Sequence, residues 1–319
     1  MDIQFLVGKQ TAEGTAKLTG LNQLDCTNYG VVPKVNKTTS KAIGAGRWER
    51  DGFVSKVEVN GDLTIEATTG QLEILLEGAG FKGTKNGKNQ DFLPGTFDNF
   101  LTLISNNIED DIAEYAQDCL VSSLKISTQM EAFVNVTANI IGKEHKVLNN
   151  KINATPVALR GESLICLGAV IKETSTDMTA KIESIDINID NKLEGKGALN
   201  TVYTTKIRQA DRGTVGLNLT FNSFDKDSYK SAYEMLRKNT SYVVEVTLAE
   251  TTDPTKIVKL EFPNVKVSNV EATNLDGAGG MTKELTAYYD KVSQTPVKIT
   301  FDNYHDAKGV GNEKRKKIT

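Results

Sequence analysis

The sequence contains little of what a catalytic centre, a metal site or a disulfide-bonded domain needs. Its 319 residues include two histidines, His145 and His305, and neither has a partner at metal-ligand spacing. The cysteines, Cys26, Cys119 and Cys166, are odd in number and widely spaced, which argues against disulfides or a CxxC metal site. We therefore expect free, mostly buried thiols, no metal and no cofactor.

Catalytic motifs are also missing from the sequence. It has no GxSxG, no P-loop, no GxGxxG after a strand and no HExxH. The acidic pairs Asp110–Asp111 and Asp225/Asp227 could bind a cation or act as glycosidase carboxylates. They lie at turns and helix starts, where Asp is favoured for capping alone. A glycine-rich stretch at residues 276–280 could hold an anion, but a flexible connection is favoured. We expect the protein not to be an enzyme.

Long apolar runs are absent, so no membrane span is expected. The N-terminus lacks a basic start followed by an apolar stretch, so we expect no secretory signal and synthesis in a reducing cytoplasm. The net charge is −3, and the body shows no basic face of the kind that grips DNA. Residues 305–319 are basic. This tail is either a solvated end or a contact with another subunit or nucleic acid.

What the sequence does have is alternation of apolar and polar residues with a period of two. It is clearest at residues 57–67, 185–190 and 215–221, and recurs near 124–127, 132–141, 243–248, 256–262 and 297–301. One apolar and one wet face per strand favour antiparallel sheets. Helical spacing occurs at 69–80 and at 227–239, where Asp225 or Asp227 would be the N-cap and Asn239 the C-terminal stop.

These elements come in the same order twice. GDLTIEA leads into the first helix and VGLNLTF into the second, and LVSSLKIS (120–127) parallels VKVSNVEA (265–272). Long polar segments, 28–52 and 191–213, precede the alternating strands and end in ERDG and ADRG. Duplication explains this order better than a chance likeness of short strands, although the register is imperfect. We predict domains at 1–155 and 156–304, with a tail at 305–319.

The segment VEVNGDLTIEATTGQLEILLEGAG resembles the strand–turn–helix pattern of tail tube proteins from long-tailed, non-contractile phages. The opening VGKQTAEGT is similar to the start of that family, and SIDINIDNKLEGKG followed by ADRGTVGLNLTF is similar to its second-half pattern. The resemblance covers about residues 5–302 and depends on the order of the motifs, since none is diagnostic alone. It implies a mainly β protein of two tandem antiparallel sandwich or half-barrel domains, each with one flanking helix.

The family further implies a virion protein whose subunits form rings, stacked into a hollow tube for DNA ejection and assembled in the host cytoplasm. Two-domain members form trimeric, pseudo-hexameric rings, with tape-measure and terminator or tip proteins as partners and no membrane. A polar-to-acidic lumen would repel phosphates, so we expect Glu58, Asp62, Glu66, Asp186 and Asp190 to line it. The family assigns the long loops to subunit contacts, and the predicted contact residues are Lys41, Arg47, Trp48, Arg50, Lys196, Tyr203, Lys206 and Arg208.

Other classes of protein stay open at this point. A tandem β-sandwich adhesin or carbohydrate-binding module is the main alternative, but it would favour clustered exposed aromatics, and aromatics are 7% of the chain with one Trp. A tube protein of a tailocin or another phage-derived particle fits the sequence equally well. Trp48 lies in a glycine-rich loop beside Arg47 and Arg50, where it would either form a contact surface or anchor the loop on its own domain.

Overall fold

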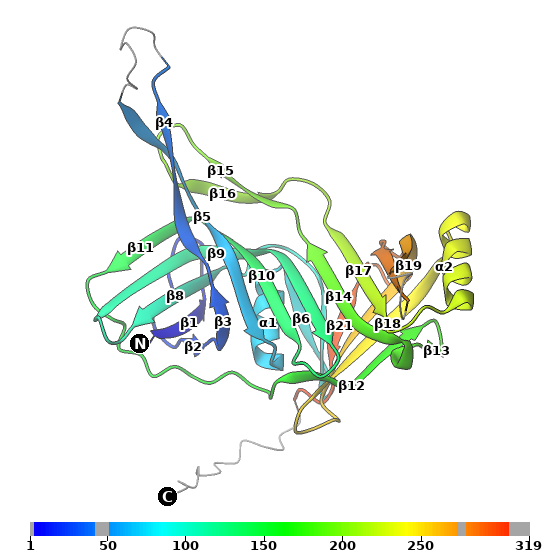
Figure 1. The fold of residues 1–319 in the computed structure, drawn as a ribbon. Helices are drawn as coiled ribbons and strands as arrows, with labels where there is room; N and C mark the ends of the chain where they lie inside the picture. Colours follow the sequence, from blue (N-terminus) through cyan, green and yellow to red (C-terminus); the bar gives the residue numbers. More distant parts are fainter. Residues whose placement is uncertain (1–2, 42–50, 274–278, 306–319) are drawn as a thin grey trace, which may run out of the picture.

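The computed structural model describes residues 3–41, 51–273 and 279–305. Strands dominate it, as the period-two alternation predicts, and two α-helices interrupt them (Figure 1). The first half contains β1 (Ile3–Lys9), β2 (Asn22–Gln23), β3 (Cys26–Tyr29), β4 (Val32–Thr39), β5 (Gly52–Glu66), α1 (Thr69–Gly78), β6 (Phe81–Asn86), β7 (Asn89–Pro94), β8 (Leu101–Asn107), β9 (Ile112–Gln129), β10 (Asn135–Gly142) and β11 (Glu144–Leu148).

The second half repeats this order of strands and helix, with differences in its hairpins and short strands. It contains β12 (Leu164–Glu173), β13 (Thr176–Asp177), the 3-10 turn η1 (Thr179–Lys181), β14 (Ile182–Asp190), β15 (Leu193–Gly197), β16 (Thr204–Gln209), β17 (Thr214–Phe221), α2 (Lys226–Lys238), β18 (Ser241–Glu250), β19 (Ile257–Thr273), β20 (Gly280–Ala287) and β21 (Lys298–Phe301).

Both predicted helices are confirmed, and their ends follow local chemistry. Thr68 caps α1 by accepting a hydrogen bond from the backbone N–H of Gln71. Asp225 caps α2 by accepting from the N–H groups of Asp227 and Ser228, because a short acceptor side chain satisfies otherwise unpaired amides of a first turn. Asn239 ends α2 in the left-handed conformation, as expected of a C-terminal Asn.

One antiparallel sheet runs through both halves of the molecule. Its order is β4 and β3 beside β5, then β10, β9, β14, β17, β20 and β19. The halves join where the second part of β9 pairs with β14, from Ser184 opposite Gln129 to Asp190 opposite Ser123. Buried residues of one face, among them Leu63, form a core that continues across this join. The halves are therefore fused edge to edge.

Matching β-bulges place the two halves in register. Thr27 of β3 and Glu183 of β14 are each passed over in the pairing with the next strand. Ser122 of β9 and Ser268 of β19 are passed over in the same way. Because a bulge fixes local register, residues 120–127 correspond to 266–273. The sequence comparison with 265–272 was wrong by one residue, because the sequence alone does not show that Ser122 and Ser268 are the equivalent, bulged positions.

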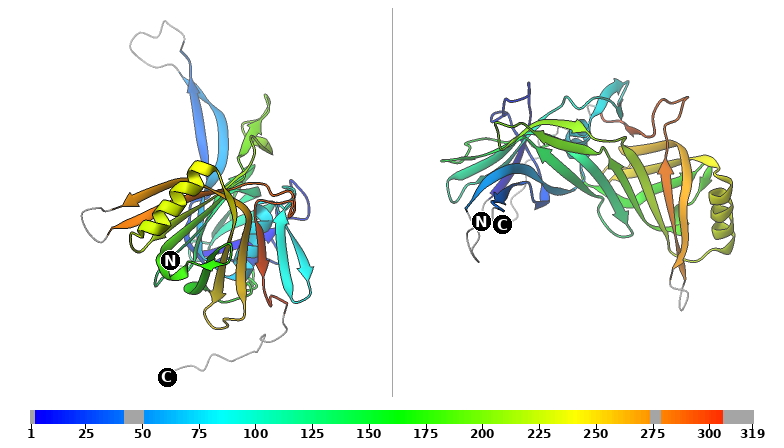
Figure 2. Two further views of the ribbon diagram at one scale, coloured as in Figure 1. Left: turned by 90° about the vertical axis from the view of Figure 1, so that its right-hand side faces the viewer. Right: turned by 90° about the horizontal axis from the view of Figure 1, so that it is seen from above.

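Two further features depart from the sequence-based expectation. Residues 28–52 and 191–213 were expected to be long loops, but they contain the end of β3 and the whole of β4, β15 and β16. The β4–β5 hairpin projects far from the body, and the β15–β16 hairpin lies beside its base (Figures 1 and 2). The β6–β7 hairpin follows α1 and pairs through β7 with β21 of the second half. No comparable hairpin follows α2, which leads directly into β18.

Candidate assembly surfaces

The wet face of the continuous sheet gathers most of the predicted acidic residues. Glu66 begins a row of directly opposed residues that crosses six strands and reaches Glu284. Asp62 and Asp190 belong to a parallel row two steps along, and Glu58 lies further out on the same side of β5. Members of the first row are Glu66, Asn135, Ser127, Asp186, Asn218 and Glu284.

Lysines partly neutralise this acidic face. Lys125 forms an ion pair with Asp186 across the β9–β14 join at 3.2 Å, and Lys192 pairs with Asp190. Hydrogen bonding from Lys56 lowers the pKa of Glu58, so this carboxyl stays charged. Asp62 accepts a hydrogen bond from the Asn139 side chain at 2.8 Å. The face is thus polar and mildly acidic, with its charges held by neighbours.

Sequence reasoning missed some members of this face. Lys125, Glu271 and Glu284 are exposed or half-exposed on it. The alternation in LVSSLKIS already indicates that Lys125 points to the face away from the buried Leu124 and Ile126. Which wet face looks toward a lumen was not decided by the alternation, and the assignment of all five acidic residues to a lumen stays a prediction.

The predicted contact residues fall on two neighbouring hairpins. Lys196 lies on β15, Lys206 and Arg208 lie on β16, and Tyr203 forms an isolated bridge with Val57 of β5. Lys196, Lys206 and Arg208 were expected in a loop but belong to strands, because the polar segment pairs with itself from Leu193 to Gln209. Lys41 is exposed at the end of the β4 arm, while Arg47, Trp48 and Arg50 lie outside the described residues.

The β4–β5 arm carries apolar side chains that its own fold leaves uncovered. Val35 is 52% exposed and Phe53 is 67% exposed, and Val32 and Val54 are also exposed. Apolar residues clustered on a projecting hairpin are typical of a contact surface. The arm therefore fits the predicted role in subunit contacts, because it exposes apolar side chains within a segment that is polar in overall composition.

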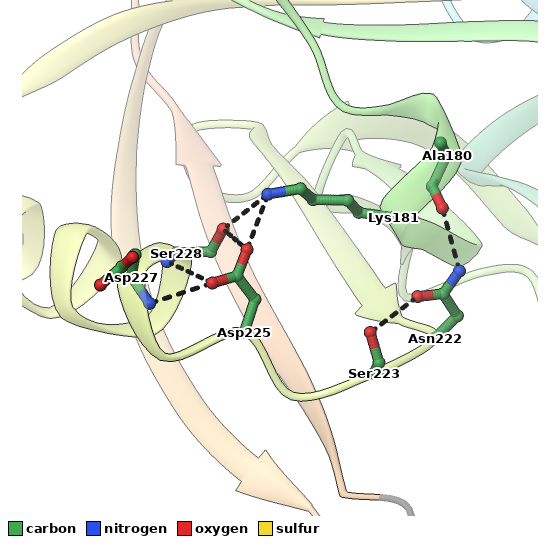
Figure 3. A network of polar contacts seen from close by, with 7 residues as sticks. All are labelled: Ala180, Lys181, Asn222, Ser223, Asp225, Asp227 and Ser228. Atoms are coloured by element: carbon green, nitrogen blue, oxygen red, sulfur yellow. Dashed lines mark hydrogen bonds and ion pairs between the residues drawn. The ribbon is translucent and has the colours of Figure 1, made fainter.

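Helix α2 is fixed at its N-terminus but open along its outer side. Figure 3 shows the Asp225 carboxylate bonded to the first turn of the helix and to Lys181 at 2.7 Å. These bonds lower the pKa of Asp225 far below its ordinary range. Ala232 is buried, whereas Tyr233 is 48% exposed. The helix is held firmly, and its solvent-facing side presents the ring of Tyr233 among charged residues.

Helix α1, the counterpart of α2, is buried, and residues of the second half contact it in addition to β6 and β9 of the first half. Glu250 accepts a hydrogen bond from Thr69 at 3.0 Å, and Tyr304 bonds to Glu73. Asn191 donates from its amide to the carbonyl of Ala79 at the end of the helix, at 3.0 Å. The second half therefore holds α1 along its whole length.

The two histidines take structural positions. His145 lies in β11, and its ring is 3.2 Å from Glu114. Burial lowers the pKa of His145. His305 is hydrogen-bonded to Gln90 at 2.8 Å. Among the described residues, no group of three or more His, Cys, Asp or Glu side chains could hold a metal ion. The same part of the chain has no helix that could span a membrane.

Comparison with known families decides what these surfaces belong to. The model of the phage tail tube protein family matches residues 2–301. The chain belongs to this family. The match covers nearly all of the described sheet and both helices of this tail tube protein, and it confirms the resemblance that the ordered motifs indicated. No curated protein matches the chain. Family membership makes the protein a structural component of a phage tail, with the exposed arm, the open helix and the wet face as its candidate assembly surfaces.

Proposed function

We propose that this tail tube protein polymerises into stacked rings that form the hollow conduit for DNA ejection. The observation that carries the proposal is the edge-to-edge fusion of two similar half-sheets through β9 and β14. A subunit that already contains one such join needs only to repeat it with further copies to extend the sheet around a pore. Three copies would supply six similar half-sheets, so a trimeric ring is the expected stoichiometry.

In this arrangement the wet face of the sheet lines the lumen. Asp62 and Asp186 lie on that face, in separate rows of the sheet. A mildly acidic lining repels the phosphate backbone at short range and lets DNA pass without being held. Tape-measure and terminator or tip proteins would meet the ends of the tube, and assembly would take place in the host cytoplasm.

The β4–β5 and β15–β16 hairpins project on the same side of the sheet (Figure 1). We assign them to contacts between successive rings, where the exposed Val35 and Phe53 would become buried. Deletion of part of residues 44–52 should leave a folded, soluble subunit that does not form tubes. Normal tubes from that deletion would exclude the role of the arm in assembly.

Electron microscopy of the purified protein tests the main proposal. Hollow tubes or stacked rings are the expected result, and persistent monomers that bind glycans would favour an adhesin instead. The lumen assignment has its own test in Asp62→Lys combined with Asp186→Lys. Tubes of this variant should retain added DNA fragments at low salt, whereas wild-type tubes should not. A map with these side chains on the outer wall would overturn the lumen assignment.

A further inference from the structure

The two ends of the continuous sheet are complementary to each other. In the second half of β19, residues 269–273 pair with β20 on one side. On the other side of these residues, the described chain provides no strand. At the opposite end of the sheet, β3 and β4 pair with β5 on one side only. The matching bulges make these edges the counterparts of β9 and β14, which do pair with each other inside the chain.

We propose that the edge of β19 in one copy pairs with the edge formed by β3 and β4 in a second copy, in the register of the internal join. This inference rests on the proposed function and specifies its subunit contact. Within the chain, Asp186 is opposite Ser127, Asn188 is opposite Lys125 and Asp190 is opposite Ser123. Counting from the bulges converts these pairs into Gly30 opposite Thr273, Val32 opposite Glu271 and Lys34 opposite Asn269.

Charges at the two open edges support this register. Inside the chain, the base Lys125 on β9 contacts the acid Asp186 on β14. The counterpart of Lys125 is Glu271 on β19, and the basic residue on the other edge is Lys34. Lys34 is the counterpart of Asp190, while the counterpart of Asp186 is Gly30, so a base and an acid again lie across the seam but on the other diagonal. Lys34 and Glu271 would be diagonal neighbours on the wet face, a separation that long side chains can bridge.

The outer side of α2 lies at the same end of the molecule as the β19 edge (Figures 1 and 2). The second half contacts α1 from across the internal join, with hydrogen bonds from Glu250 and Asn191 among the contacts. A second copy seated in the same register would approach α2 as the second half approaches α1. This would cover the exposed ring of Tyr233 and that of Phe224, which is 41% exposed.

The contact between copies is built to be weaker than the internal join. The N–H of Gly30 points to β5 and donates to the Asp62 carbonyl at 2.8 Å. Because N–H directions alternate along a strand, a backbone N–H at position 33 would point outward, toward the second copy. Position 33 is a proline, which has no N–H to donate. The seam therefore lacks one hydrogen bond, and no hairpin after α2 reinforces it as β6–β7 does inside the chain. A proline on an open edge also hinders indiscriminate pairing of strands before assembly.

Cysteine cross-linking in assembled particles tests the register. Lys34→Cys combined with Asn269→Cys should yield disulfide-linked oligomers, up to closed trimers, on non-reducing gels. The matched control is Lys34→Cys with Glu284→Cys. Glu284 lies on the same wet face as Asn269, but on β20, which is one strand further from the Lys34 of the neighbouring copy. The wild-type chain controls for Cys26, Cys119 and Cys166. If tubes form but the first pair links no better than the control, the register is wrong while the proposed function stands. If the wild-type protein forms no rings or tubes, the proposed function itself fails.

A charge exchange gives a second, independent readout. Lys34→Glu should raise the protein concentration needed for assembly by about two- to fivefold, since it places like charges across the seam. Adding Glu271→Lys should restore assembly, and Lys34→Glu with Lys125→Glu should not. Assembly by Lys34→Glu at the wild-type concentration, or failure of Glu271→Lys to restore it, would overturn the proposed contact.

Discussion

Leu76 and Tyr233 occupy the same position on the two helices, counted from the N-caps Thr68 and Asp225. Their surroundings differ because Leu76 is 0% exposed and Tyr233 is 48% exposed. The same truncation should therefore affect the two halves of the isolated subunit very differently. Leu76→Ala removes core volume, whereas Tyr233→Ala removes a side chain that the subunit leaves half in water.

The size of the difference follows from burial. Truncating a fully buried Leu to Ala costs about 2–5 kcal/mol of unfolding free energy, because the cavity collapses only in part. At about 2–4 °C per kcal/mol, the Tm should fall by about 4–20 °C. For Tyr233→Ala we expect less than about 1 kcal/mol, as for other surface changes. Circular dichroism melts and urea titrations of the unassembled subunit would measure both, and light scattering would confirm that no oligomer is present.

Assembly should reverse the order of the two effects. Tubes of Tyr233→Ala should form poorly, because the variant lacks the aromatic side chain that would be buried against the next copy. Folded Leu76→Ala subunits retain the assembly surfaces and should form tubes. Equal losses of Tm in the isolated subunits would refute the unequal burial of the helices. Normal tubes from Tyr233→Ala would refute burial of α2 between copies.

Three further substitutions probe the joins within the chain. Gly61→Ala should destabilise the subunit by about 1–3 kcal/mol, measured by urea titration, because an added Cβ would lie 1.9 Å from the carbonyl oxygen of Gly30; an unchanged midpoint would contradict this. Asn191→Ala should cost about 1–3 kcal/mol per carbonyl left unpaired, since its amide bonds to two buried carbonyls, and Asn191→Asp is the matched test of the lost donor. Burial raises the pKa of Glu250 above its ordinary 4.5, so the folded state holds this proton more tightly than the unfolded state. The group's contribution to stability is therefore full below pH 4.5 and is lost as the pH rises through the raised pKa of the folded state. Glu250→Gln should flatten that part of the Tm–pH curve, and a curve identical to wild type would count against it.

The local sequence was sufficient for the secondary structure wherever a period was unbroken. Alternation predicts β5, β14 and β17 because one face of each strand is apolar and the other wet. The helices were also predictable, since their apolar spacing, N-caps and the terminal Asn239 act within a few residues. Family membership, too, was predictable from the order of these elements along the chain.

Tertiary structure alone decided how the halves meet and what remains open. The pairing of β9 with β14 joins residues far apart in sequence, and its register depends on bulges that alternation does not reveal. The polar segments became hairpins because their strands pair with each other or with β5, a choice that composition does not specify. Leu76 and Tyr233 have the same place in their helices, and only the tertiary packing around each helix makes one of them core and the other surface. Local periodicity fixes the conformation of each element, but the burial of its faces depends on long-range contacts.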